Sequence, residues 1–312
     1  MLSALNGPKT AVTSARVVVL MVIMLGIGGQ ALLYWDGSGY GGGWNSVQAA
    51  TTSGHHLHHH SMDSNANESS LNHVCVLIPL KRELILDAIS SVEKTRDSRF
   101  NYSMFLGIDD DDASLGAAIE QSPYIRGMHT KTTLVRVPNP LHKPGPVMNG
   151  LSKAGLEAGC DYLYRVNDDT EWSDANWTSR IVDTMRAFSP PNVGVVGPTC
   201  NEGNEMILTH DFVHAKNHHT IFGSHYPAAL TDWWLDDWIT KVYGPARTKK
   251  LPDVEVRHNL RATRYEVNHT NRNLLDGLVL EGSRLVEDFL QSDTAALRPS
   301  VVQNFSAAFK NV

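Results

Sequence analysis

The segment KPGPVMNGLSKAGLEAGCDYLYRVNDDTEW, residues 143–172, decides the fold class. Its first half predicts a helix over residues 149–159, and its second half contains the apolar run 161–166, which is typical of a buried strand. This strand leads directly into the sequence Asn167-Asp168-Asp169. A helix followed by a strand that ends in carboxylates indicates an α/β sheet with a polar site beyond the end of the strand.

The rest of the chain continues this alternation. Apolar runs typical of strands lie at residues 74–80, 102–108, 132–138, 193–196 and 254–258, and helical periodicity is found at residues 82–94, 113–121 and 177–188. Strands that alternate with helices of this length predict a mainly parallel sheet flanked by helices. Ligands of such sheets bind beyond the carboxyl ends of the strands, where the acidic residues 109–112 and 168–169 both fall.

The composition is that of an ordinary globular protein. The 312 residues carry a formal net charge of -6, which argues against binding to a nucleic-acid backbone. An anionic ligand must therefore be bound by local groups, such as a metal ion or a few basic side chains. Three cysteines (Cys75, Cys160 and Cys200) are too few for a disulfide scaffold, and their odd number leaves at least one unpaired. Cys75 lies in an apolar run and is expected to be a small buried hydrophobic side chain.

The N-terminal region is expected to anchor the chain in a membrane. Residues 17–34 contain no charged side chain and are long enough to cross a thin bilayer as a helix, with Lys9 and Arg16 on their amino-terminal side. By the positive-inside rule, residues 1–16 form a cytosolic tail, and the rest of the chain lies in the lumen of the Golgi or the endoplasmic reticulum, as in a single-pass type II protein. The alternative is a cleaved signal peptide, because small residues near Ala31 offer a cleavage site.

The remaining organisation follows from composition. Residues 35–72 are rich in Gly, Ser, His and Asn and predict a flexible stem. The folded catalytic domain is expected at residues 73–290, followed by a C-terminal tail at residues 291–312. Five N-x-[S/T] triplets are compatible with a lumenal glycoprotein. They lie at Asn67, Asn101, Asn176, Asn268 and Asn304.

Two groups of residues have the chemistry of metal ligands. Asp168 and Asp169 follow a buried strand, where carboxylates need solvent or a cation. Their oxygens suit Mn²⁺ or Mg²⁺ bound against a diphosphate, because these hard cations take oxygen ligands and share them with phosphate. The alternative is a solvated strand end or a helix N-cap. His258 ends the run 254–258, and its imidazole suits a third ligand of Mn²⁺, with a purely structural role as the alternative.

A further pair of carboxylates lies in the segment ALTDWWLDDWITKVYG, residues 229–244. Asp236 and Asp237 are adjacent and therefore about 100° apart around a helix, so only one of them can point squarely into a cleft. A carboxylate near an incoming hydroxyl can act as a general base. Three nearby tryptophans have two readings, a stacking wall for a sugar ring or part of the core. They are Trp233, Trp234 and Trp238.

The aspartates at residues 109–112 follow another predicted strand. Their spacing does not match a calcium EF-hand loop, which would need a ligand at Ala113 and a glycine at Ser114. One or two of them could accept hydrogen bonds from a nucleotide base or ribose. The others are expected to be solvated or to cap the helix that follows.

Taken in order, four segments resemble the GT-A-fold glycosyltransferases, in particular the family-2-like members. The segments that carry the resemblance, which extends over residues 74–258, are VCVLIPLKRE, LGIDDDD, KPGPVMNGLSKAGLEAGCDYLYRVNDDTEW and WWLDDW. The resemblance implies a GT-A-like single domain. It also implies that Pro79 and Leu80 border the nucleotide and that Asp109 contacts the uracil or ribose.

The same resemblance implies roles at the metal and at the acceptor. Asp169 would be the main metal ligand, supported by Asp168 or Asn167, and His258 would match the late metal-binding histidine of some members. Asp237 would match the second acidic residue of the catalytic pair and deprotonate the acceptor hydroxyl. Asn167 stands where the family's D-x-D motif has its first aspartate, which weakens the expected metal site.

The sequence therefore predicts a metal-dependent glycosyltransferase. It would move a hexose or N-acetylhexosamine from a nucleoside diphosphate sugar to a hydroxyl of a glycan, protein or lipid. Inversion of configuration is predicted, and retention is the open alternative. One alternative is a glycan-binding pseudoenzyme, which Asn167 motivates. The other is a nucleotidyltransferase, which normally has a glycine-rich loop where this chain has LKRE.

Overall fold

The computed structural model describes residues 18–25, 29–36, 45–46, 71–201, 205–259 and 266–308. The chain divides into two units, Met1–Asn67 and Glu68–Val312. The predicted cytosolic tail and nearly all of the predicted stem lie outside the described residues.

The described part of the first unit is a small antiparallel sheet. It contains β1 (Val18–Leu25), β2 (Gly29–Asp36) and β3 (Asn45–Ser46), and Val18 pairs with Asp36 at the open end of the β1–β2 ladder. The helix predicted over residues 17–34 is therefore wrong. β-Branched residues such as those in this sequence favour an extended backbone, and the glycines that follow them weaken a helix. None of the helices in the described residues has the length and apolar character to span a membrane.

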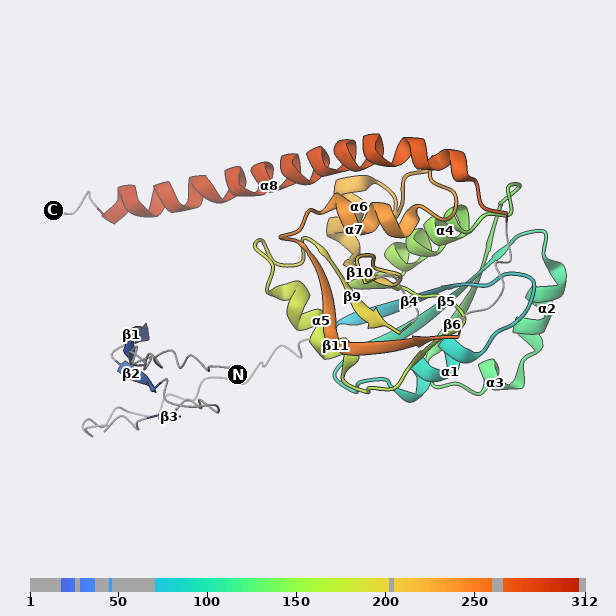
Figure 1. The fold of residues 1–312 in the computed structure, drawn as a ribbon, viewed down its shortest axis with the longest axis horizontal. Coiled ribbons are helices and arrows are strands. Elements are labelled where there is room, and N and C mark those ends of the chain that lie inside the picture. The colour runs from blue at the N-terminus through green and yellow to red at the C-terminus, as the bar shows by residue number, and fades with distance from the viewer. Residues whose placement is uncertain are drawn as a thin grey trace, which may run out of the picture. The chain divides into compact units, whose positions relative to one another are not determined.

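The second unit contains an eight-stranded mixed sheet (Figure 1). Its strands, in spatial order, are β6 (Lys131–Val137), β5 (Asn101–Asp109), β4 (His73–Pro79), β7 (Tyr162–Arg165), β10 (Asp211–His214), β9 (Val195–Cys200), β11 (Thr248–His258) and β8 (Thr170–Trp172). The first four strands are parallel, as predicted. Strand β10 is antiparallel to both its neighbours, and β8 is antiparallel to β11, so the sheet is less parallel than expected. Strands β8 and β10 have three and four residues, too few to show a periodic pattern.

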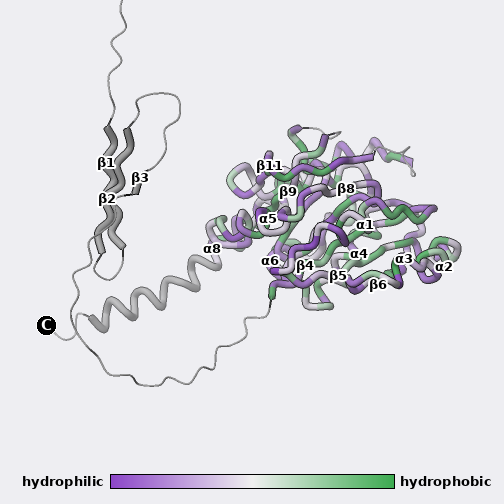
Figure 2. Tube along the Cα trace, turned by 90° about the horizontal axis from the view of Figure 1, so that it is seen from below, coloured by the Kyte–Doolittle hydropathy of each residue, from purple (hydrophilic) through white to green (hydrophobic). Residues whose placement is uncertain are grey.

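Alternate residues of the central strands pack into two cores on opposite faces of this sheet. In β4, Val74, Val76 and Ile78 belong to one core, and Cys75 and Leu77 belong to the other. Helices α1 (Asp87–Lys94), α2 (Ala113–Gln121) and α5 (Trp177–Arg186) contribute to the first core, and α3 (Pro123–Arg126) follows α2. Helices α4 (Pro144–Glu157), α6 (Ala215–Phe222), α7 (Leu235–Val242) and α8 (Arg272–Ala308) contribute to the second, and η1 (His269–Asn271) precedes α8. The unit is thus an α/β/α sandwich, and along its elements apolar stretches alternate with polar ones (Figure 2).

Several elements differ in extent from the prediction. Helix α1 begins at Asp87 rather than at residue 82, because Arg82 has a left-handed backbone with φ 67°. Helix α4 begins at Pro144, since proline is tolerated in the first turn of a helix. Helices α6 and α8 were not predicted. The first turns of α8 lie across α6 and α7, and the helix continues beyond the expected domain boundary at residue 290 (Figure 1).

Close packing of α4 against the sheet explains why a glycine, Gly107, stands in β5. A Cβ atom at Gly107 of β5 would lie only 2.6 Å from Val147 and 2.8 Å from Leu151 of α4. The helix can approach the strand this closely because the side chain is absent. This contact fixes the start of α4 near the carboxyl end of β5.

A disulfide joins Cys75 of β4 to Cys160, which precedes β7, and Cys200 is a buried free thiol. The prediction that Cys75 is only a buried hydrophobic side chain is therefore wrong, although its full burial is confirmed. The two cysteines are close because β4 and β7 are parallel neighbours, with Cys75 opposite Leu163. That strand pairing is not visible in the spacing of the cysteines along the sequence.

We expect the double variant Cys75→Ala/Cys160→Ala to lose about 4 kcal/mol in the free energy of unfolding, because the bridge closes a long loop in the unfolded chain. The sequence separation of the two cysteines is 85 residues. Urea unfolding under non-reducing conditions measures the change, with Cys200→Ala as the control for loss of a buried thiol. A double variant as stable as the parent would show that the bridge does not constrain the unfolded state.

Candidate active site

The candidate site lies at the edge of the sheet that is formed by the ends of its strands, not beside an edge strand. Strands β5, β4 and β7 are parallel neighbours, so their carboxyl ends meet at this edge. Asp109 ends β5, Pro79 ends β4, and Asn167 to Asp169 follow β7 within a few residues. The structure thus confirms that both acidic clusters lie beyond the carboxyl ends of the strands.

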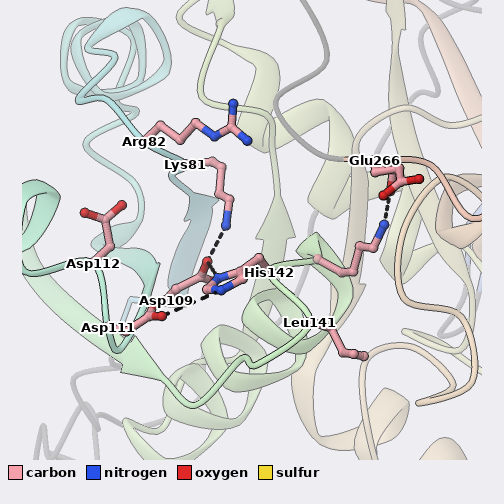
Figure 3. Close-up of a pocket in the computed structure, with 9 residues that line it drawn as sticks. Lys81, Arg82, Asp109, Asp111, Asp112, Leu141, His142 and Glu266 are labelled. Carbon is pink, nitrogen blue, oxygen red and sulfur yellow. Dashed lines mark hydrogen bonds and ion pairs between the residues drawn. The ribbon is translucent and has the colours of Figure 1, made fainter.

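A pocket of about 490 Å³ opens beside the ends of β4 and β5 (Figure 3). Its lining combines acidic and basic side chains: Lys81, Arg82, Asp109, Asp111, Asp112, Leu141, His142, Lys143 and Glu266. Two of these residues, Arg82 and His142, have positive φ values of 67° and 51°. Such backbone conformations cost about 1–3 kcal/mol in non-glycine residues and occur often at ligand sites. These two residues with an unusual backbone conformation therefore lie in the same pocket.

Asp109 is the central acidic group of this pocket. It is 4% exposed, and its carboxylate pairs with Lys81 and accepts hydrogen bonds from His142 Nδ1 at 3.0 Å and Asn139 Nδ2 at 2.6 Å. Burial alone would raise the pKa of Asp109, but the bonds from Lys81, His142 and Asn139 outweigh it and lower the pKa. Asp109 is therefore an ionised acceptor, held rigidly at the pocket wall (Figure 3).

The other residues expected near the nucleotide have distinct positions. Asp112 caps α2 by accepting a bond from the Leu115 backbone, as predicted for part of this acidic cluster. Pro79 and Leu80 immediately precede the pocket residue Lys81, and the Leu80 backbone donates to Gly107. The predicted nucleotide-binding residues Pro79, Leu80 and Asp109 are thus neighbours in space.

The predicted metal ligands Asp169 and His258 are brought together by the pairing of β8 with β11, which places His258 opposite Thr170. His258 Nε2 lies 2.8 Å from Asp169 Oδ1. The hydrogen bond with Asp169 is the main reason that the pKa of His258 is raised to about 9. A cation bound between these two side chains would replace the proton that they share, as is usual when a metal binds to a histidine.

Two other candidate ligands lie close by. Asp168 is 2% exposed, and its carbonyl accepts a bond from Ala88 of α1. The Asn167 side chain accepts a hydrogen bond from Arg165 at 3.4 Å, so its oxygen is directed toward that guanidinium. The structure thus joins Asp169 with His258 as a pair and places Asn167 and Asp168 beside them on the chain.

The donor atoms of this region suit a hard divalent cation. Carboxylate oxygens are common ligands of both Mn²⁺ and Mg²⁺ where a bound phosphate supplies further oxygens, whereas an imidazole suits Mn²⁺ better than Mg²⁺. Within the described side chains, a second cluster brings together ligand atoms of Asp109, Asp111 and His142, all within 4.8 Å of one another. It lies in the pocket, and its Asp109 is already held by Lys81. Asp169 and His258 supply two ligand atoms and are likewise paired with each other, so the two groups are alternative places for a cation.

The pair Asp236–Asp237 lies in the first turn of α7. Asp236 forms an ion pair with the buried Arg165, whereas Asp237 Oδ1 lies 3.5 Å from Lys241 Nζ. Burial is the largest influence on Asp236 and raises the pKa of its carboxyl in spite of the Arg165 charge. The two side chains are 30% and 22% exposed, so they differ in their partner rather than in their exposure: Asp236 pairs with the buried Arg165 and Asp237 with the exposed Lys241.

The three tryptophans in and just before α7 were predicted either to stack on a sugar ring or to pack in the core, and the structure gives them different surroundings. Trp238 is fully buried in the core, and Trp234 is partly buried with the Arg272 guanidinium 5.7 Å from its ring centroid. Trp233 is 54% exposed. Core packing is therefore the role of Trp238, while Trp233 is the member whose ring is accessible to a sugar.

Sequence reasoning missed several residues of the site, among them Lys81, His142 and Arg165. Lys81 and His142 contact Asp109 across long sequence separations, and Arg165 contacts both Asn167 and Asp236. A usable signal existed for Arg165 alone, because a charged residue inside the apolar run 161–166 needs buried partners. Nothing in the sequence pattern links Lys81 or His142 to Asp109.

No protein-family model and no curated protein matches this chain. Among solved structures, a mannosyltransferase of Pyrobaculum calidifontis in complex with GDP-Man and Mn²⁺ has 15% identity and a TM-score of 0.42, over 75% of this chain and 79% of its own. TarS of S. aureus in complex with UDP has 12% identity and a TM-score of 0.47, over 67% of this chain and 65% of its own. Another structure of TarS is covered over only 39% of its length.

A glucosyl-3-phosphoglycerate synthase of Mycobacterium tuberculosis, in complex with Mn²⁺, UDP-glucose and phosphoglyceric acid, is also similar. It has 9% identity and a TM-score of 0.45, over 68% of this chain and 80% of its own. Sequence identities and TM-scores this low do not support an inference of function, so the function is inferred from the residues of the site.

Proposed function

We propose that this protein is a glycosyltransferase that uses a nucleoside diphosphate sugar and a divalent cation, Mn²⁺ or Mg²⁺. The observation that carries the proposal is the arrangement at one sheet edge. A nucleoside-sized pocket around Asp109, a metal-compatible pair of Asp169 and His258, and the carboxylates of α7 all lie near the carboxyl ends of neighbouring strands. Nucleotide ligands of α/β sheets bind at this position.

The donor's nucleoside fits the pocket because its wall combines acceptors and donors. Asp109 is ionised and can accept a hydrogen bond from a base N–H or a ribose hydroxyl. Lys81 and Arg82, which directly follow β4, bring positive charge to the same pocket. Basic side chains at that point suit the phosphates of the donor.

Asp169 and His258 would hold the cation, supported by Asn167 or Asp168. When bound, the cation supplies positive charge that stabilises the leaving diphosphate. Asp237 would take the proton of the acceptor hydroxyl while the oxygen of that hydroxyl forms a bond to the anomeric carbon and the bond from this carbon to the diphosphate breaks, with the diphosphate as the leaving group. This sequence inverts the anomeric configuration. Trp233 would offer an exposed ring to a sugar of the acceptor.

We also propose that the folded unit lies in the lumen of the secretory pathway. The bridge between Cys75 and Cys160 supports an oxidising compartment, because disulfides form and persist there. The transferred sugar is proposed to be a hexose or an N-acetylhexosamine. The donor panel described next distinguishes the two.

The test is a panel of UDP- and GDP-sugars offered to the full chain with Mn²⁺ and, separately, with a chelator. We expect at least one donor to raise the thermal unfolding temperature and to be slowly hydrolysed, in both cases only with metal, because a ligand that binds the folded state stabilises it. Release of the free nucleoside diphosphate measures turnover. Metal-dependent binding without any turnover would favour the pseudoenzyme, and binding of no donor would overturn the proposal.

A further inference from the structure

A buried arginine lies directly beneath the candidate active site. Arg165 ends β7 and is 2% exposed, so its guanidinium needs protein partners for its donors. Its Nε donates to the Tyr226 hydroxyl at 2.9 Å, and its Nη1 donates to the Thr209 carbonyl at 2.5 Å and to Asn167. Its Nη2 pairs with Asp236. One side chain therefore joins the strand that leads to the metal ligands with the first turn of α7.

Arg165 is itself held from below by a second layer of buried groups. Asp211 of β10 is fully buried and lies 3.1 Å from Arg165 Nε. Its carboxylate also contacts His225 Nε2 at 2.7 Å and accepts a bond from the Tyr226 hydroxyl at 2.5 Å. Burial opposes ionisation of Asp211, but these partners outweigh it and lower the pKa of its carboxyl. The guanidinium is thus fixed between two carboxylates, only one of which is at the surface.

The surface carboxylate is Asp236, whose side chain is 30% exposed. On the same helix Leu235, Trp238 and Ile239 are buried in the core. Core contacts on one side and the Arg165 ion pair on another fix the rotation of α7 about its axis. Since adjacent residues of a helix differ by about 100° in direction, this rotation also fixes the direction of Asp237.

We propose that Arg165 and Asp236 are positioning residues, a clamp that sets the orientation of Asp237 for its reaction with the acceptor. The inference rests on the proposed function. The Asp236 carboxylate is committed to the guanidinium, which leaves Asp237, whose contact with Lys241 is a loose 3.5 Å, to act on substrate. The layer of Asp211, His225 and Tyr226 serves to hold Arg165 in place.

The test compares Asp236→Asn, Asp237→Asn and the double variant in the full chain. Asp236→Asn weakens the clamp from its surface side and leaves Arg165 with Asp211. We expect kcat to fall about 10-fold with an unchanged KM for the donor, because misplacement of a reacting group lowers the rate without removing substrate contacts. In the Asp237→Asn background the same change should cause no further loss, since a positioning residue acts only through the group that it positions.

Two further variants separate positioning from stability. Arg165→Lys keeps the charge but cannot bridge Asp211 and Asp236 with one nitrogen, so it should lower kcat in the same way as Asp236→Asn. Asp97→Asn breaks the ion pair with Arg99 at the opposite edge of the sheet and should lower the unfolding temperature with kcat unchanged.

Losses of kcat that multiply in the double variant would overturn the clamp, as would a raised donor KM with normal kcat. A parent protein that turns over no donor would instead overturn the proposed function, and this result is distinct from either pattern among the variants.

Discussion

Asp169→Asn is expected to abolish metal-dependent binding of the nucleotide sugar while the fold stays intact. Asp169 is the carboxylate of the pair with His258, and its replacement by an amide removes the negative charge that this pair offers to a cation. The loss of donor affinity in Mn²⁺ should be at least about 10²-fold, the upper range seen for residues that only support a ligand. Calorimetric titration of the donor with and without Mn²⁺ measures it.

Two variants serve as controls for this result. Asp174→Asn changes a partly exposed carboxylate that pairs with Arg180 and should leave donor binding as in the parent. Asp168→Asn changes the adjacent aspartate and should have a smaller effect than Asp169→Asn. If Asp169→Asn binds donor and Mn²⁺ like the parent, the cation lies elsewhere, and the cluster of Asp109, Asp111 and His142 is the next place to examine.

The features that sequence reasoning placed correctly are those with a local cause. An acidic residue directly after a buried apolar run must lie at the end of a strand, so Asp109 and Asp169 could be assigned to the edge of the sheet before their contacts were known. The parallel order of β4, β5 and β7 followed from the helices between them. Asp112 as a helix cap depended only on residues three positions apart.

The features that it missed depend on contacts between distant segments. Cys75 and Cys160 meet because β4 pairs with β7, and Arg165 meets Asp236 because α7 packs above the end of β7. Strand β10 has four residues, too few for alternation to be distinguished from a loop. The predicted membrane helix failed for another reason, since an uncharged run has the same composition in a helix and in the β1–β2 hairpin.

The second large effect is expected at the pair on α7. Asp237→Asn should retain affinity for the donor and the metal yet lose about 10²–10⁴ in transfer rate, because it removes a general base without removing a binding contact. Asp236→Asn should be milder, since Asp236 is bound to Arg165 and acts through the placement of its neighbour. Transfer rate and donor affinity are measured for both variants, with circular dichroism to confirm folding.

The relative size of the two effects decides the assignment. Lys241→Ala is a useful control, because it removes the nearby amine of Asp237 and keeps both carboxylates, so that transfer should persist. An inactive Asp236→Asn beside an active Asp237→Asn would reverse the roles of the two residues. Full activity in both variants would exclude an inverting reaction based on this pair. His210 and Asp211 would not readily replace it as a base, because both are fully buried, so retention of configuration would become the mechanism to test.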